Sequence, residues 1–294
     1  MIIPYFYTDF RCKAGDCRHT CCRGWEIDID EDTAAYYHEL QGPLGEAIRS
    51  HIEKGDDAWH FILTKDEACP FLRTDGLCRL IREGGEDLLC QICRLHPRFF
   101  EVVTDKDGRE RELGGVGLAC EAACELLLKE KGPLHFLDSD DPSAAWTLSD
   151  LLTSLGYTLQ ADSLTYRPDT SKKSTDQLLT VLTETEPIDA AWTASLTALT
   201  KERPTEESLQ ASLRKDRPLY QRIYDYIFYR QLETFAGSSL EVLSRYAGRN
   251  TDFIALTAVA SGHLPEALRR WSEQIEYDMD NVRLLQEAVL TGRL

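Results

Sequence analysis

Cysteine is the residue with the clearest chemical pattern in this sequence of 294 residues, since all ten cysteines lie in the first 124 positions. Thiolates are nucleophiles and soft metal ligands, so this concentration indicates a metal site, disulfides or redox-active thiols. The ten positions are Cys12, Cys17, Cys21, Cys22, Cys69, Cys78, Cys90, Cys93, Cys120 and Cys124.

Metal binding is favoured over disulfides by the context of these cysteines. The segment before Cys17 lacks the basic start, long apolar run and small-residue cleavage site of a secretory signal. The sequence contains no run of 18 or more apolar residues, so it predicts no membrane-spanning helix. We therefore expect a cytoplasmic protein, and stable disulfides are rare in a reducing cytosol. Adjacent Cys21 and Cys22 do not easily pair with each other because their side chains diverge.

The spacing favours an iron-sulfur cluster over zinc, which stays the alternative. Structural zinc sites usually use two Cys-x2-Cys or Cys-x2-His pairs, and only Cys90 and Cys93 form such a pair here. Iron-sulfur clusters take thiolate ligands at more varied intervals. His19, between Cys17 and Cys21, is either an extra ligand or an exposed loop residue.

The acidic composition constrains the partners. The net charge is -17, and no Lys/Arg-rich run is present. The negative electrostatic field of this protein repels phosphate, so we expect no nucleic-acid partner. Because the sequence has no apolar span, we also expect no membrane partner. The charge favours cationic partners such as lysine-bearing protein substrates, or it only maintains solubility.

The expected fold is mainly α, an α-rich α+β protein. Residues 1–131 are expected to form a loop-rich cysteine-cluster domain, with a helix capped by Asp30 or Asp32 and a small hairpin of residues 99–104 and 112–118. Residues 132–294 are expected to form an all-helical half. Its clearest element is an aromatic-rich helix over residues 218–235, which is either a core helix or the lining of a pocket. Residues 114–117 (GGVG) lack the spacing of a nucleotide loop and predict a turn.

Several motifs together resemble the flagellin lysine-N-methylase family, which is counted among proteins whose cysteine cluster chelates zinc or iron. The motifs are CCRGWEI at residues 21–27, CPFL at 69–72, GLC at 76–78, GE at 85–86, CRLHPR at 93–98 and CEAA at 120–123. Their order and spacing match throughout residues 12–124. The aromatic helix that contains Tyr226 and Arg230 is similar to the family's C-terminal region.

The resemblance implies a transferase that moves methyl groups from S-adenosylmethionine to lysine ε-amines of flagellin and carries a [4Fe-4S] cluster. The positions that match the family's cysteines are Cys12, Cys17, Cys21, Cys22, Cys69, Cys78, Cys93 and Cys120. Cys90 stands where the family commonly has Ser, and Cys124 where it has Ala. His96 replaces a Tyr and Glu121 a Pro, and the chain is shorter than typical members.

Two further residues are candidates for binding the cofactor. Trp25 either stacks on a ligand or packs over the cluster and excludes water. Arg98 either holds a carboxylate of the methyl donor or pairs with an acidic side chain. The sequence assigns no catalytic residue. Two other functions stay open, a non-catalytic interaction module stapled by zinc or iron and a metal carrier or electron-transfer protein.

Overall fold

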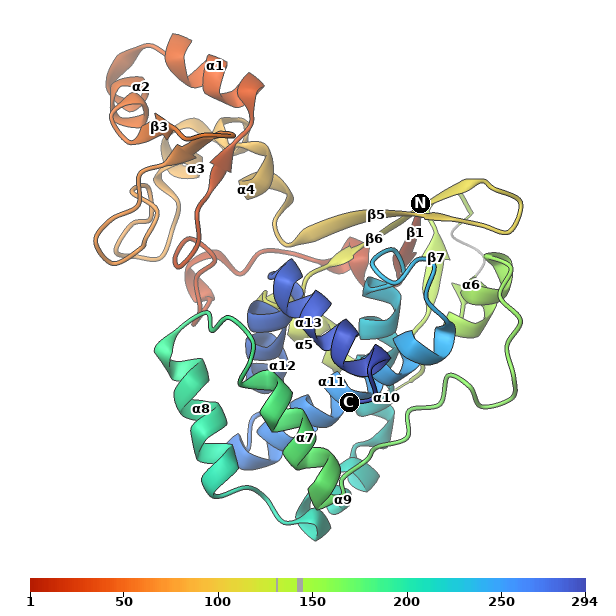
Figure 1. Cartoon of the computed structure of the whole chain (residues 1–294). Coiled ribbons are helices and arrows are strands. Elements are labelled where there is room, and N and C mark those ends of the chain that lie inside the picture. Colours follow the sequence, from red (N-terminus) through yellow and green to blue (C-terminus); the bar gives the residue numbers. More distant parts are fainter. Residues whose placement is uncertain (131, 142–144) are drawn as a thin grey trace. The chain divides into compact units, whose positions relative to one another are not determined.

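The chain forms two units, one of which is inserted into the sequence of the other. The computed structural model describes residues 1–130, 132–141 and 145–294. The larger unit combines Met1–Phe10 with Phe99–Leu294, and the smaller unit is Arg11–Arg98 (Figure 1). This division differs from the boundary expected after residue 131, which itself lies outside the described residues, because the hairpin and the helix after it belong to the larger unit.

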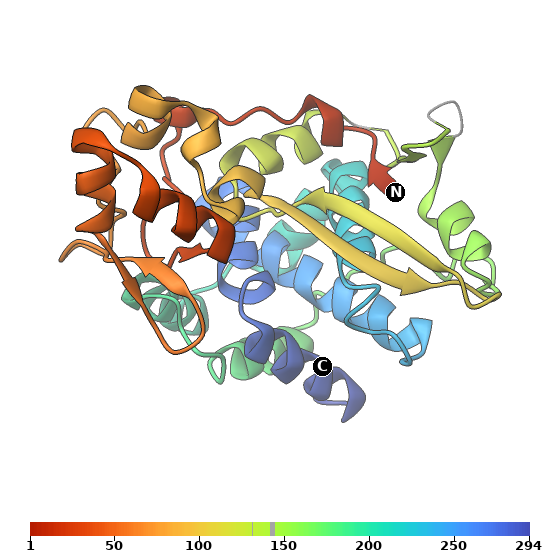
Figure 2. The ribbon, with the colours of Figure 1, turned by 90° about the horizontal axis from the view of Figure 1, so that it is seen from above.

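A five-stranded sheet in the larger unit has the order β5-β6-β1-β7-β8. Its strands are β1 (Ile2–Pro4), β5 (Arg98–Thr104), β6 (Glu110–Val116), β7 (Phe136–Asp138) and β8 (Ala145–Trp146). The central strand β1 runs parallel to β6 and antiparallel to β7. The long ribbon of β5 and β6 is visible in Figure 2. The hairpin expected from the sequence is therefore confirmed, and it is one edge of a larger sheet.

Helices make up the rest of the larger unit. They are α5 (Glu121–Lys129), α6 (Leu148–Ser154), α7 (Lys172–Leu182), α8 (Ala190–Lys201), α9 (Glu206–Lys215), α10 (Arg217–Arg230), α11 (Leu240–Ser261), α12 (Leu264–Trp271) and α13 (Met279–Leu290). A short 3-10 turn, η1 (Tyr7–Asp9), follows β1, and a π-helical segment, η4 (Ser272–Glu276), follows α12. The expected α-rich α+β class is confirmed, although β7 and β8 precede the helices of the C-terminal half.

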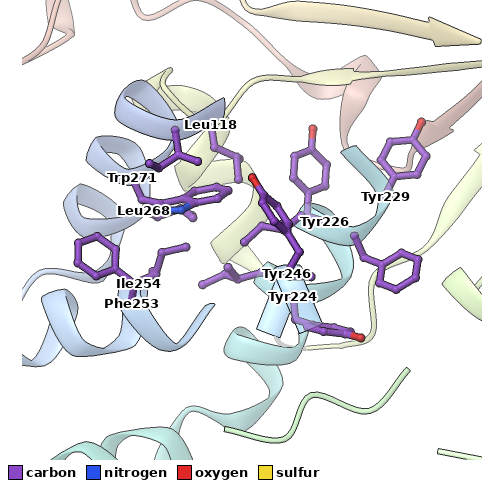
Figure 3. Close-up of a cluster of buried hydrophobic side chains, with 14 of the residues drawn as sticks. Leu118, Tyr224, Tyr226, Tyr229, Tyr246, Phe253, Ile254, Leu268 and Trp271 are labelled. Carbon is purple, nitrogen blue, oxygen red and sulfur yellow. The ribbon is translucent and has the colours of Figure 1, made fainter. Parts of the chain in front are cut away.

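The aromatic helix α10 lies in the core of the larger unit. Tyr226 and Tyr229 are fully buried, and they gather with Tyr246 of α11 and Trp271 of α12 (Figure 3). The Tyr229 hydroxyl lies 2.8 Å from the carbonyl oxygens of both Ile2 and Gly114. This helix is therefore a core helix that also fixes the sheet, since its hydroxyls bond to two strands.

Close packing against Phe99 and α10 explains Gly115 of β6. Gly114, Gly115 and Val116 belong to this strand, so the turn expected at residues 114–117 is wrong for these three. A Cβ atom at Gly115 would lie 2.3 Å from the Phe99 ring and 2.9 Å from the Tyr226 hydroxyl. The glycine is needed because the ring and the hydroxyl occupy the space of a side chain.

Arg222 of α10 anchors several segments to this core. Its side chain is fully buried, and among the described residues it forms no ion pair with a carboxylate. Nε donates to the Leu127 carbonyl at 3.0 Å, and Nη1 donates to the carbonyls of Gly132 at 2.8 Å and Pro133 at 3.1 Å. Nη2 donates to the Tyr5 hydroxyl at 3.0 Å. One guanidinium thus holds the end of α5, the loop after it and the segment after β1.

The smaller unit has its own core and sheet. Its elements are η2 (Ala14–Asp16), β2 (Asp28–Ile29), α1 (Glu31–Glu39), α2 (Gly42–Arg49), β3 (Ile52–Lys54), β4 (Trp59–Phe61), α3 (Arg79–Gly84), η3 (Glu86–Leu88) and α4 (Gln91–Leu95). The three strands pair antiparallel in the order β2-β4-β3. Asp30 caps α1 by accepting a hydrogen bond from the Thr33 backbone N–H at 3.0 Å, as one of the two sequence alternatives predicted.

Within the described ranges, no helix is both long enough and apolar enough to cross a membrane.

Candidate metal centre

Five cysteines come together at the core of the smaller unit. Cys69 and Cys90 belong to its buried core, and three half-buried thiols pack against that core. These three are Cys22, Cys78 and Cys93. The thiols of the five are close enough to influence one another's charge. We call this set the thiol centre.

Local backbone structure positions each thiol. The Cys69 backbone N–H donates to the Cys22 carbonyl at 2.8 Å, next to a bridge between Arg23 and Ala68. Cys78 is the residue before α3, and Cys90 is the residue before α4. The thiol centre is therefore built from one backbone pairing and two short helices.

The loop between Cys69 and Cys78 closes tightly. Gly76 has a φ of 76°, and its N–H donates to the Arg73 carbonyl at 3.0 Å. The Arg73 guanidinium also donates to the Asp75 carboxylate at 2.9 Å. The turn expected at Asp75–Gly76 is thus present, and it returns the chain so that both cysteines reach the thiol centre.

Asp30 is a positioning residue that the sequence indicated only as a helix cap. Its Oδ2 accepts a hydrogen bond from the Gln91 backbone N–H at 2.8 Å, and its Oδ1 caps α1. One carboxylate therefore ties α1 to the first residue of α4, the helix that carries Cys93. Behind α4, the buried Tyr37 hydroxyl donates to the Leu88 carbonyl at 2.5 Å.

Burial and mutual hydrogen bonds shift the pKa values of the thiols in the thiol centre. Burial raises the pKa of the Cys69 thiol to about 12 and also raises the pKa of Cys78. The Cys93 thiol donates to the Cys90 sulfur, which raises the pKa of Cys93 and lowers that of Cys90. A hydrogen bond from Cys21 lowers the pKa of Cys22 to about 7. A metal ion stabilises thiolates that would otherwise repel one another in such a buried place.

The donor atoms of the thiol centre are of a type that suits a soft metal. All five groups are soft sulfur donors, which suit iron-sulfur clusters and zinc. Among residues 1–130, 132–141 and 145–294, no group of three or more His, Cys, Asp or Glu side chains is arranged to hold a metal ion. The type and location of these residues therefore fit an iron-sulfur cluster or zinc. Their side chains are not arranged around a common metal position.

The remaining predicted ligands are not among these five thiols, although the Cys21 side chain forms a hydrogen bond with that of Cys22. Cys12 and Cys21 are exposed and Cys17 is half-exposed, all in the N-terminal part of the smaller unit. Cys120 belongs to the larger unit, where it directly precedes α5. Of the eight cysteines taken from the family resemblance, the structure brings together Cys22, Cys69, Cys78 and Cys93. Which of the eight bind metal stays a prediction.

Cys90 and Cys124, the two cysteines that depart from the family pattern, have different surroundings. Cys90 lies within the thiol centre, although the resemblance gave no reason to place it there. Its distance of three residues from Cys93 was the signal that could have indicated this place. Cys124 is fully buried in the larger unit, and its Sγ donates to the Leu118 carbonyl at 2.9 Å. This thiol therefore has a core position of its own.

Trp25 and Arg98, the predicted cofactor-binding residues, have distinct settings in the smaller unit. The Trp25 indole Nε1 donates to the Cys21 carbonyl at 2.7 Å, and its ring lies 5.9 Å from the His96 ring. Trp25 also packs against the core that contains the thiol centre, which agrees with a role in covering it. Arg98 is half-buried at the start of β5. Their contact with a cofactor stays a prediction.

The fold and the thiol centre define an α-rich protein with an inserted cysteine-rich unit. Part of its sequence is similar to known proteins. Lysine-N-methylases of Salmonella choleraesuis and Salmonella typhimurium are each 33% identical to it over 133 residues, or 43% of this chain. This chain spans about a third of their length, 32% in each case. The flagellar biosynthetic protein FliU of Salmonella muenchen is 30% identical over 133 residues, which cover 76% of that protein.

The match to FliU covers most of that relative, and the chain therefore belongs to the family of this flagellar protein. No family model matches the sequence. No solved structure matches it either. The family resemblance expected from the cysteine motifs is thus supported at its coarse level, as a distant and partial similarity to lysine-N-methylases.

Proposed function

We propose that this protein is a protein-lysine N-methyltransferase that uses S-adenosylmethionine and carries an iron-sulfur cluster at the thiol centre. The gathering of five thiols in the core of the smaller unit is the observation that carries the proposal. The names of the lysine-N-methylase relatives support the reaction.

The thiol centre would hold the cluster through Cys22, Cys69, Cys78 and Cys93, with Cys90 as a further donor. A bound cluster supplies Lewis-acid or electron-transfer chemistry. The protein contributes a dry, shaped environment, since Tyr37 and Phe71 are buried in the core beside these thiols and Trp25 packs over it. Such surroundings tune a cluster through solvent access and hydrogen bonding.

The proposed substrate is a protein with exposed lysines, of the flagellin type. A net charge of -17 attracts a lysine-bearing surface and raises the rate of encounter. The name of the FliU relative connects the family with flagella. Thiolate ligands of a cluster have to stay reduced, so we place the reaction in the reducing cytoplasm.

The proposal is tested in two steps on the full chain purified without oxygen. Iron and acid-labile sulfide are measured first, together with the visible absorption spectrum. The protein is then incubated with flagellin and S-adenosylmethionine, and added methyl groups are located by mass spectrometry. Iron, sulfide and lysine methylation together would support the proposal, whereas protein without iron and sulfide would refute the cluster.

The partial match to the lysine-N-methylases favours a second candidate function. Because the chain spans only about a third of those relatives, it could share their cysteine-rich part without their reaction. The protein would then be an interaction module stapled by zinc or iron, or a metal carrier or electron-transfer protein. Bound zinc without methylation would favour the module, and a reversible redox titration without methylation would favour electron transfer.

A further inference from the structure

A polar cavity in the larger unit lies between two helices and the segment before the first of them. Its volume is about 650 Å³, and its lining comes mainly from the segment at residues 160–171, from α7 and from α11. Binding sites for small molecules typically have volumes of about 300–1,000 Å³. The cavity has no residue in common with the thiol centre, and neither the motifs nor the charge pattern of the sequence indicated it.

Unpaired cations predominate among the charged side chains of this cavity. Arg167, Lys173 and Arg245 are exposed, and within the part of the chain that the structure describes none of the three forms an ion pair or a hydrogen bond. Asp162 is an exposed acid of the lining whose carboxylate likewise has no partner among the described residues. The net charge of the protein is -17, so this excess of cations is a local exception. Like charges that face one cavity repel one another, and a bound anion would relieve this repulsion.

A buried ion pair forms part of the cavity wall and fixes its shape. Arg249 donates through Nη1 to the Asp252 carboxylate at 2.5 Å and through Nη2 to the Ser174 carbonyl at 2.6 Å. Asp252 also accepts a hydrogen bond from the Tyr166 hydroxyl at 2.7 Å. These contacts join α11 to α7 and to the segment before it. The wall is therefore ordered before any ligand binds, which lowers the cost of binding.

The start of α7 forms another part of the wall. Ser171 caps this helix of 11 residues by accepting a hydrogen bond from the Ser174 N–H at 3.3 Å. The Ser171 N–H itself donates to the Asp169 carboxylate at 3.2 Å, so this acid of the lining is already engaged. The N-terminus of a helix carries a partial positive charge that favours anions. It therefore acts in the same direction as the unpaired cations.

The packing of the two helices brings Lys173 and Arg245 to the same cavity. Lys173 directly precedes Ser174, whose carbonyl accepts the Arg249 hydrogen bond. Arg245 lies four residues before Arg249 and thus on the same face of α11. Gly248 of α11 also lines the cavity, and no described atom outside its own backbone surroundings lies within 4 Å of the place that a Cβ atom would take. Open space thus remains for a ligand beside the cations.

We infer that this cavity is a binding site for a small molecule that carries a phosphate group. A phosphate group has close to two negative charges at neutral pH, and arginine, lysine and the start of a helix all bind it. The volume of the cavity exceeds the needs of one phosphate group. Hydroxyl and amide side chains supply hydrogen bonds to the rest of the molecule, and they are Gln160, Ser163, Thr165, Gln177 and Ser244. The inference goes beyond the proposed methyl transfer and does not depend on it.

The experiment titrates the full chain, purified without oxygen, with inorganic phosphate and with ribose 5-phosphate in a calorimeter at about pH 8. We expect one saturable site for both probes, and tighter binding of ribose 5-phosphate because its hydroxyl groups reach the polar lining. The double variant Lys173→Gln with Arg245→Gln should bind ribose 5-phosphate at least about tenfold more weakly, since charge-assisted hydrogen bonds are lost.

Two variants test the cavity without removal of a cation. Gly248→Leu fills open space beside the cations and should also weaken the binding of ribose 5-phosphate. Asp162→Asn removes the unpaired acid and should tighten binding about twofold, because this carboxylate repels the phosphate group. Asparagine tolerates the φ of 60° found at this position. Weaker binding in Asp162→Asn would contradict the inference of an anion site.

The matched control is the double variant Lys172→Gln with Arg214→Gln, which changes the net charge by the same amount. Both residues are exposed and lie outside the lining of the cavity. The affinity should stay within about twofold of that of the unchanged protein, since exposed distant charges are screened by salt. Circular dichroism should show every variant folded. Equal losses in the two double variants would overturn the inference, because the overall charge would then explain the binding.

Three further outcomes would also overturn the inference. Without saturable binding of inorganic phosphate, the cavity is not a phosphate site. If succinate binds as tightly as ribose 5-phosphate, the site does not select phosphate. If ribose 5-phosphate binds no more tightly than inorganic phosphate, the cavity does not recognise a larger phosphorylated molecule. Methylation of flagellin without phosphate binding would leave the proposed function standing and refute only the assignment of this cavity.

Discussion

Replacement of Arg222 by Met should destabilise the larger unit strongly. The guanidinium makes four hydrogen bonds of 2.8–3.1 Å to Leu127, Gly132, Pro133 and Tyr5, and its side chain is fully buried. Methionine keeps the aliphatic part of the side chain, so the change mainly removes the charge and the donors. Three backbone carbonyls then lose a donor inside the protein.

The expected magnitude follows from two opposing effects. Each hydrogen bond to a charged group contributes about 1.5–3 kcal/mol, so the four together contribute about 6–12 kcal/mol. Removal of the buried charge also removes its desolvation penalty, which is several kcal/mol for one ion. The net loss in the free energy of unfolding should be about 3 kcal/mol, within the range typical of broken buried polar networks.

Urea denaturation followed by far-ultraviolet circular dichroism measures this loss. With an m-value of about 3 kcal/mol per M, the midpoint of the larger unit's transition should fall by about 1 M. Arg217→Met is the control, because Arg217 lies on the same helix and is exposed, and its midpoint should stay within about 0.2 M. A midpoint shift below about 0.3 M for Arg222→Met would refute the reasoning.

Three further predictions concern the thiol centre, a buried acid and a packed glycine. Cys69→Ser should lower the iron bound per chain after anaerobic purification, whereas Cys124→Ser should not, and equal iron in both variants would contradict the location of the centre. Burial raises the pKa of Asp225 from 3.8 to about 7. The folded state therefore keeps a proton that the unfolded state loses, and stability should fall as the pH rises from about 4 to about 7. Asp225→Asn should flatten this dependence in urea midpoints measured across that range, and an unchanged slope would exclude this carboxyl as its source. Gly115→Ala should cost about 2 kcal/mol in the same denaturation assay, and Gly117→Ala less than about 1 kcal/mol, because the latter meets only the hydroxyl end of a half-exposed tyrosine. Equal losses for the two glycine variants would count against the packing argument.

Local sequence signals predicted the elements whose cause is local. The hairpin of β5 and β6 follows from apolar segments around an Asp-Gly turn, and the start of α1 follows from the Asp30 cap. Helix α11 continues through Gly248, a residue of low helix propensity, because Asn250 accepts a hydrogen bond from the Trp271 indole at 2.7 Å and this tertiary contact holds the middle of the helix.

Long-range pairings were beyond the reach of the sequence. The strand β1 has only three residues, and its partners β6 and β7 come more than a hundred positions later. For the same reason, the cysteine motifs predicted a cluster but not its membership. The family resemblance counted Cys120 among the ligands, and the structure places this residue in the larger unit, directly before α5. Cys90 joins the thiol centre as the residue directly before α4.

The insertion of the smaller unit between β1 and β6 affects the order of events during translation. Residues 2–4 leave the ribosome before residues 11–98, and the strands that pair with them leave afterwards. The smaller unit has its own core and sheet, so its fold can form while β1 still has no partner. If the proposed cluster is loaded on the nascent chain, its loading would precede closure of the central sheet.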